Sequence, residues 1–181
     1  LRNQTVPHFF FNSINTLSGL IEVDTKKADR YLDEMCVVYR YLLRNEPDTF
    51  VPLSAELSFI RSWMYIVQTR YGNSLQFAII GDGPSHHACI SRLCLLTFLE
   101  EIFDTYIFDK NDSFNISIYI KPDCVEIVHP VWKLKGTRTQ ASEVQTEEVK
   151  AMHRLLGLPE IKEQVHQNTK TIIIPTQRSE T

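Results

Sequence analysis

The stretch VPHFFFNSINTLSGLI, Val6–Ile21, decides how the rest of the sequence is interpreted. Apolar side chains recur in it every three or four residues, which predicts a helix over residues 1–22. His8 follows a proline and precedes Asn12 by one helical turn, so a helix places these two polar residues on one face. A histidine in an apolar run is most often a packed core or surface residue. The alternative is a nucleophile presented on a helix, because a neutral imidazole has a free ring nitrogen at neutral pH.

Residues 26–44 predict a second helix whose apolar side chains form a stripe at helical period. Asp24 or Thr25 is the expected N-cap, and the short link EVDT makes the two helices antiparallel neighbours. Such a hairpin buries little apolar surface by itself. It therefore needs cover, either from a second copy in a four-helix bundle or from the rest of the chain.

The segment NEPDTFVP, Asn45–Pro52, carries two prolines and several turn-forming residues, so we place a domain boundary there, between residues 1–50 and 51–181. The later elements are predicted in the order helix 53–71, strand 75–80, helix 93–108, strands 114–120 and 124–132, helix 142–157 and strand 170–176. Ser142 and Gln145 fit a capping box at the start of the last helix. One mixed or antiparallel sheet with helices on one face suits this order, and the tail 176–181 is expected to fray. The predicted fold class is α+β.

The composition excludes several classes of protein. The chain has 181 residues, of which 43% are hydrophobic, and a formal net charge of −3, which argues against a nucleic-acid partner. No apolar run reaches the ~18 residues that span a bilayer. The four cysteines are scattered without a C-x-x-C pair, so we expect buried free thiols and no metal site. Trp63 and Trp132 are expected to be packing residues, and His153 and His166 to lie at the surface.

Several motifs together resemble the LytS-type sensor histidine kinases. LRNQTVPHFFFNSIN, at residues 1–15, matches that family's pattern L-x-x-Q-x-x-P-H-F-L-F-N-x-L-N at eight positions. Further matches lie in YRYLLRN, VPLSAEL and YIVQTRYGNSL, so the resemblance covers residues 1 to about 80 strongly. Beyond that it is carried by the order of elements and by LLTFLEE.

The resemblance implies a fold and an activity. Residues 1–50 would form a dimerising helical hairpin that presents His8 as phosphoacceptor, and residues 51–181 an α/β sandwich like the GHKL-type ATPase domain. ATP and Mg²⁺ would lie between helices and sheet, with Glu100 in the acidic position of the family helix. His8 would attack the γ-phosphate, Asn12 would orient its ring, and a response regulator would receive the phosphoryl group. The module would lie on the cytoplasmic side of an inner-membrane sensor protein, whose membrane anchor would lie outside these residues.

The sequence departs from that family at three parts of the nucleotide site. Glu101 stands where the family has a magnesium-binding asparagine, which adds negative charge beside a triphosphate. His129 and Pro130 replace the aspartate and glycine that follow a strand, and proline removes a backbone donor. The segment TRTQASEVQTEEV lacks the glycines of a phosphate-cradling lid. Loss of all three predicts weak or lost ATP binding.

Three functions follow from these observations. The first is a signalling module with a degenerate nucleotide site, a pseudokinase that forms a homodimer through residues 1–50. Either its His8 is phosphorylated by a partner kinase, or the dimer only binds a partner. The second is an active autokinase in which Glu100 acts as base and Glu101 as a metal ligand. The third is a non-enzymatic dimeric interaction protein in which the Pro-His-Phe run is core packing.

Overall fold

The computed structural model describes residues 2–44, 49–81, 88–108, 113–132, 134–135 and 140–178. The chain divides into two compact units, which are described separately. The first consists of Leu1–Glu46 with Ser58–Gly72, and the second of Pro47–Leu57 with Asn73–Thr181. The boundary that we predict between residues 50 and 51 stays a prediction.

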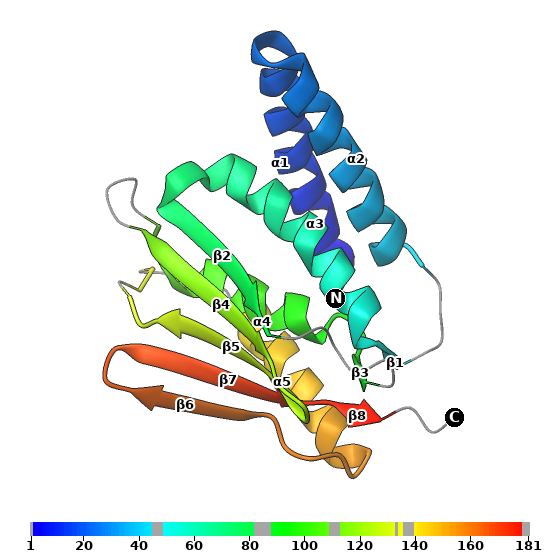
Figure 1. Ribbon diagram of the computed structural model, residues 1–181, viewed down its shortest axis with the longest axis vertical. Helices are drawn as coiled ribbons and strands as arrows, with labels where there is room; N and C mark the ends of the chain where they lie inside the picture. The colour runs from blue at the N-terminus through cyan, green and yellow to red at the C-terminus, as the bar shows by residue number, and fades with distance from the viewer. Residues whose placement is uncertain are drawn as a thin grey trace. The chain divides into compact units, whose positions relative to one another are not determined.

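The first unit is built from three helices (Figure 1). These are α1 (Arg2–Val23), α2 (Thr25–Leu42) and the part of α3 (Leu53–Tyr71) that begins at Ser58. Asp24 alone joins α1 to α2 and is the N-cap of α2, as predicted, because its carboxylate accepts a hydrogen bond from the backbone N–H of Lys27 at 3.0 Å. The first two helices therefore form the expected hairpin.

Helix α3 supplies part of the cover that the hairpin needs. The Phe59 ring of α3 stacks on Tyr41 of α2, with 4.4 Å between ring centroids. The Arg30 guanidinium lies 4.4 Å from the centroid of the Tyr65 ring, a cation–π contact that joins the same two helices. Trp63 is buried in α3, in agreement with its predicted packing role.

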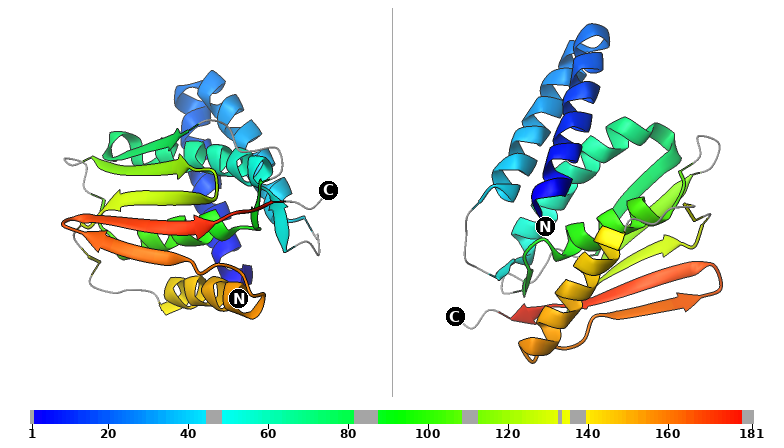
Figure 2. Two further views of the ribbon diagram at one scale, coloured as in Figure 1. Left: turned by 60° about the horizontal axis from the view of Figure 1, so that its bottom comes forward. Right: turned by 180° about the vertical axis from the view of Figure 1, so that it is seen from behind.

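The second unit contains a five-stranded sheet with strand order β2-β4-β5-β7-β6. Its strands are β2 (Leu75–Ile80), β4 (Phe114–Ile120), β5 (Cys124–Pro130), β6 (Lys162–His166) and β7 (Thr169–Pro175). Only the β2–β4 pairing is parallel. Helices α4 (Cys94–Thr105) and α5 (Gln140–Leu155) lie on one face of this sheet, as Figures 1 and 2 show. The α+β class is therefore confirmed.

The core of the second unit follows the alternation of its strands. In β5, and in β4 as far as Ile118, every second residue is buried, because successive side chains of a strand point to opposite faces. Apolar side chains of α4 are buried nearly all round, as its sequence predicts. The fully buried members of this core include Ile118, Val125, Ile127, Ile174, Phe98 and Leu99.

A second, smaller sheet corrects the prediction of a single one. It has the strand order β1-β3-β8, formed by β1 (Phe50–Pro52), β3 (Ala88–Ser91) and β8 (Gln177–Arg178). Strands of two to four residues are too short for alternation to identify them from sequence. The expected fraying of the tail is wrong at residues 177–178, which pair with β3, and residues 179–181 lie outside the described set.

Element ends differ from the predictions in several places. Helix α4 ends at Thr105, because Tyr106 forms a β-bridge with Leu134. Helix α5 already begins at Gln140, so Ser142 lies inside it and is not the N-cap that we predicted. Gly157 has a φ of +65° just after α5, where glycine adopts the left-handed conformation without strain. All four cysteines are free, but only Cys94 is buried, whereas Cys89 and Cys124 are half-buried and Cys36 is exposed.

Candidate functional site

His8 lies in the first half of α1 and is located by its backbone alone, because the side chains of residues 2–8 are outside the described set. Asn12 lies one turn later on the same helical face, and its side chain is half-buried. Pro7, in the second turn of the helix, has no amide hydrogen, so the carbonyl of residue 3 receives no hydrogen bond from it. The orientation of the His8 ring by Asn12 stays a prediction.

The residues that follow His8 contact α2 through aromatic rings. The Tyr39 ring lies 6.1 Å from the ring of Phe9 and 5.3 Å, edge to face, from that of Phe10. Ser13 is 2% exposed, and its hydroxyl donates to the carbonyl of Phe9 at 2.8 Å. Burial raises the pKa of Tyr39 to about 12. These contacts fix the part of α1 that begins directly after position 8.

Glu100 and Glu101 are neighbours in the middle of α4, and both are partly exposed. Consecutive residues of a helix do not face one another, so their carboxylates leave the helix in different directions. The Oε2 atom of Glu101 is buried and has no hydrogen-bond partner. Burial raises the pKa of Glu101, although the nearby ammonium groups of Lys170 and Lys150 oppose that shift.

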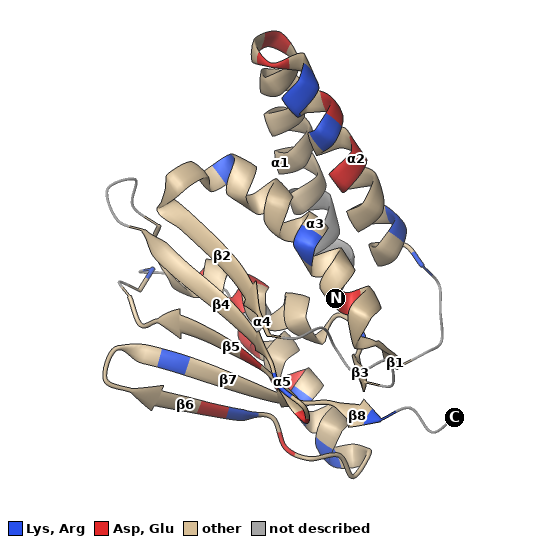
Figure 3. Cartoon of the chain, viewed as in Figure 1, with Lys and Arg blue, Asp and Glu red and all other residues tan. Residues whose placement is uncertain are grey.

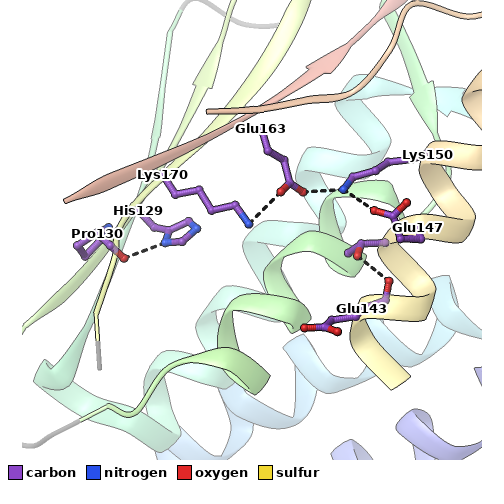
Figure 4. A network of polar contacts seen from close by, with 8 residues as sticks. His129, Pro130, Glu143, Glu147, Lys150, Glu163 and Lys170 are labelled. Carbon is purple, nitrogen blue, oxygen red and sulfur yellow. Dashed lines mark hydrogen bonds and ion pairs between the residues drawn. The ribbon is translucent and has the colours of Figure 1, made fainter. Parts of the chain in front are cut away.

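A network of ion pairs joins α5 to strands β6 and β7 (Figure 4). Glu163 of β6 lies between two lysines, with its Oε1 at 3.0 Å from Nζ of Lys150 and its Oε2 at 3.2 Å from Nζ of Lys170. Lys150 also pairs with Glu147, one turn earlier in α5, at 2.8 Å. Burial would raise the pKa of Glu163, but the two ammonium groups outweigh burial and hold it below its usual range. Glu163 is therefore ionised at neutral pH.

His129 lies opposite Lys170 in the β5–β7 pairing and is 2% exposed. Its Nδ1 is 2.9 Å from the carbonyl oxygen of Pro130, so Nδ1 carries the proton and Nε2 has a free lone pair. That Nε2 is buried without a hydrogen-bond partner. The rings of Tyr106 and Phe114 lie at centroid distances of 5.4 and 6.0 Å. Burial lowers the pKa of His129 to about 4, so the imidazole is neutral at neutral pH.

The structure brings Glu101 and His129 into one electrostatic environment, because Lys170 and Glu163 act on the pKa of both groups. Sequence reasoning identified these two positions and missed Lys150, Glu163 and Lys170, which come from three separate elements. His8 and Asn12 belong to the first unit, whereas Glu100 and Glu101 belong to the second. Among the described residues, no group of three or more His, Cys, Asp or Glu side chains is arranged to hold a metal ion.

One buried polar pair contradicts the prediction of a surface position for His153. This residue of α5 is 1% exposed, and its Nε2 is 2.9 Å from the hydroxyl of Ser91 in β3. Burial lowers the pKa of His153. The pair joins the small sheet to α5, whereas His166 is exposed on β6 as predicted.

Comparisons with known proteins identify relatives of this chain. Residues 1–75 match the family model described as "Histidine kinase". The Sensor protein LytS of Staphylococcus epidermidis is 29% identical over 129 residues, which is 70% of this chain and 22% of that protein. LytS of Staphylococcus saprophyticus is 30% identical over 67% of this chain and 20% of its own length. The Sensor histidine kinase/phosphatase LytS of Staphylococcus aureus is 39% identical over 71 residues, 39% of this chain and 12% of that protein.

The chain spans about a fifth of the length of the first of these relatives. A solved structure of a bacterial phosphotransferase matches 95% of this chain and 89% of its own, with a TM-score of 0.50 and 9% identity, which is a likeness of fold alone. No helix among the described residues has both the length and the hydropathy to cross a membrane.

Proposed function

We infer that this chain belongs with the LytS-type sensor histidine kinases, and on that premise we propose that it is the signalling module of a two-component sensor with weak or lost ATP binding. His8 is the phosphoacceptor of this module. A response regulator takes the phosphoryl group from it, and a partner kinase supplies that group. In the whole protein the module lies on the cytoplasmic side of the membrane.

One observation carries the loss of ATP binding: among the described residues, Lys150 of α5 and Lys170 of β7 are already paired with Glu163. A nucleotide triphosphate needs cations or backbone amides that are free to meet its charge. Here Lys150 and Lys170 meet a carboxylate of the chain itself. Glu101 and His129 supply no compensating positive charge, because one is an acid and the other a neutral imidazole. These residues do not suit ATP with Mg²⁺.

The chemistry at His8 needs only its own ring and a phosphodonor. A neutral imidazole nitrogen forms a bond to phosphorus while the bond from phosphorus to the donor's leaving group breaks. The phosphoryl group then leaves the imidazole for an aspartate carboxylate of the response regulator. The His8 position lies one turn before Asn12, whose amide is suited to hold the ring by a hydrogen bond.

The hairpin supports a homodimer as the working form. Helix α1 keeps large apolar side chains exposed in the described chain, and Figure 3 shows it almost free of charge along its described length. The exposed fractions are 41% for Phe10, 65% for Phe11, 40% for Ile14 and 58% for Ile21. Contiguous exposed apolar side chains mark interaction surfaces. A second copy covers this face as a four-helix bundle.

Titration calorimetry with ATP and Mg²⁺ tests the nucleotide site. We expect no binding in the micromolar range, and micromolar binding would favour an active autokinase instead.

Labelling with phosphoramidate, a small phosphoryl donor that releases ammonia, tests the phosphoacceptor. We expect label on the wild type and none on His8→Gln, and equal labelling of both contradicts the role of His8. Sedimentation of the wild type and of Phe11→Glu tests the dimer, which the exposed charge should disrupt.

A further inference from the structure

The aromatic contacts between α2 and the start of α1 have a functional consequence that rests on the proposed role of His8. Tyr39 contacts the two residues that directly follow His8, and it does so with its ring. Its position is not one of the family-pattern residues in YRYLLRN, where Arg40 and Tyr41 carry the match. We propose that Tyr39 is a positioning residue, whose ring sets the rotation and order of α1 at position 8.

The geometry of the two ring contacts supports this role. An edge-to-face pair such as Tyr39 with Phe10 and a tilted pair such as Tyr39 with Phe9 each add to simple apolar burial. Successive residues of a helix differ by about 100° around its axis, so one ring that contacts both fixes the rotation of the helix between them. Position 8 is the next residue along the same helix. The rotation of the α1 backbone at that position therefore follows from where Tyr39 holds Phe9 and Phe10.

The ring carries this function rather than the hydroxyl. The hydroxyl oxygen of Tyr39 is buried, and Ser13 is near enough to lower its pKa, but the hydroxyl makes no hydrogen bond of ordinary geometry among the described residues. Ser13, the polar residue that acts on the pKa of Tyr39, directs its own hydroxyl proton to the carbonyl of Phe9. A buried hydroxyl without a well-aligned hydrogen bond adds little stabilisation. Tyr39→Phe should therefore keep the function, and Tyr39→Ala should lose it.

Helix α2 offers a matched control two residues away. Tyr41 is also an aromatic residue near the end of α2, but its ring stacks on Phe59 of α3 rather than on α1. Tyr41→Ala removes a ring of the same type from the same unit. It therefore separates a local effect on α1 from a general loosening of the three helices.

Amide hydrogen exchange on the full chain tests the proposal. In Tyr39→Ala we expect exchange at residues 9–13 to rise at least about tenfold, since two aromatic pairs are lost, while residues 17–21 change little. Tyr39→Phe should match the wild type, and Tyr41→Ala should leave residues 9–13 unchanged. Unchanged exchange in Tyr39→Ala, a tenfold rise in Tyr39→Phe, or an equal rise in Tyr41→Ala each overturns the proposal.

Phosphoramidate labelling distinguishes this proposal from the proposed function. If the wild type takes no label at His8 while the exchange pattern is as expected, the phosphoacceptor role fails and the positioning of α1 by Tyr39 stands. If the label is present and the exchange pattern is absent, the reverse holds. The NMR chemical shifts of the His8 imidazole ring give a second readout. In Tyr39→Ala these resonances should broaden or move toward the chemical shifts of a histidine in an unfolded peptide, and in Tyr39→Phe they should not.

Discussion

Replacement of His129 by phenylalanine should remove a defined part of the pH dependence of folding. The His129 ring is buried against Tyr106 and Phe114, and phenylalanine keeps a ring in that place. The pKa of His129 is about 4 in the folded chain, below the value of about 6.5 that an unfolded chain gives. Between these values the unfolded chain binds more protons. The contribution to stability is therefore present above about pH 6.5 and is lost as the pH falls toward 4.

The magnitude follows from these two pKa values. Linkage gives a loss of about 2 kcal/mol between pH 7 and pH 5 from this one group. The wild type should therefore lose about 2 kcal/mol more of its free energy of unfolding over that range than His129→Phe does. The pKa of the buried His153 is also lowered, but its contribution is common to both proteins and cancels in the difference.

Urea unfolding followed by circular dichroism at several pH values between 5 and 7 measures this difference. His166→Gln is the matched control, because that histidine is exposed on β6 and its loss removes no buried ring. Its curve should run parallel to that of the wild type. The reasoning is refuted if the curves of His129→Phe and the wild type are also parallel, because His129 would then not be held neutral by burial.

Three other substitutions have expected outcomes that unfolding experiments can check. Glu163→Gln should lower the free energy of unfolding at pH 7 by about 1–3 kcal/mol, since its two lysine partners keep their charges and lose the carboxylate; an unchanged midpoint in urea would contradict this. Asp24→Ala should lower the free energy of unfolding by about 1 kcal/mol, because the backbone N–H of Lys27 loses its capping carboxylate. Asp24→Asn should restore most of that stability, since an amide oxygen can accept the same hydrogen bond. Gly81→Ala should cost about 2 kcal/mol or more, because its φ is +129° and a Cβ would lie 2.6 Å from the carbonyl oxygen of Ile120; thermal unfolding at the wild-type temperature would show the reasoning to be wrong.

Long periodic elements could be predicted from the sequence, and features that depend on the tertiary structure could not. Helices α1, α2 and α3 each carry five or more turns of repeating apolar pattern, and Asp24 is a recognisable cap. The exposed edge strand β6 was missed because every residue of it is exposed, which removes the alternation that marks a strand.

The candidate site shows the same limit at the level of single residues. Glu101 and His129 stand out through comparison with a family pattern. Glu163 has no such mark, because its importance comes from a lysine 13 residues before it and another seven residues after it, which only the folded chain brings together. His153 looks like a surface residue on a polar helix, and only its hydrogen bond to Ser91 explains its burial.

Helix α3 contributes its first residues to one compact unit and the remainder to the other. Neither unit can then be exchanged between related proteins as a self-contained module. A recombination point near residue 50 would combine α1 and α2 of one protein with α3 of another, and the residues at positions 59 and 65 would then come from a different protein than their partners on α2. Lineages that swap sensing and output parts should therefore keep Tyr41 and Arg30 matched to their partners on α3.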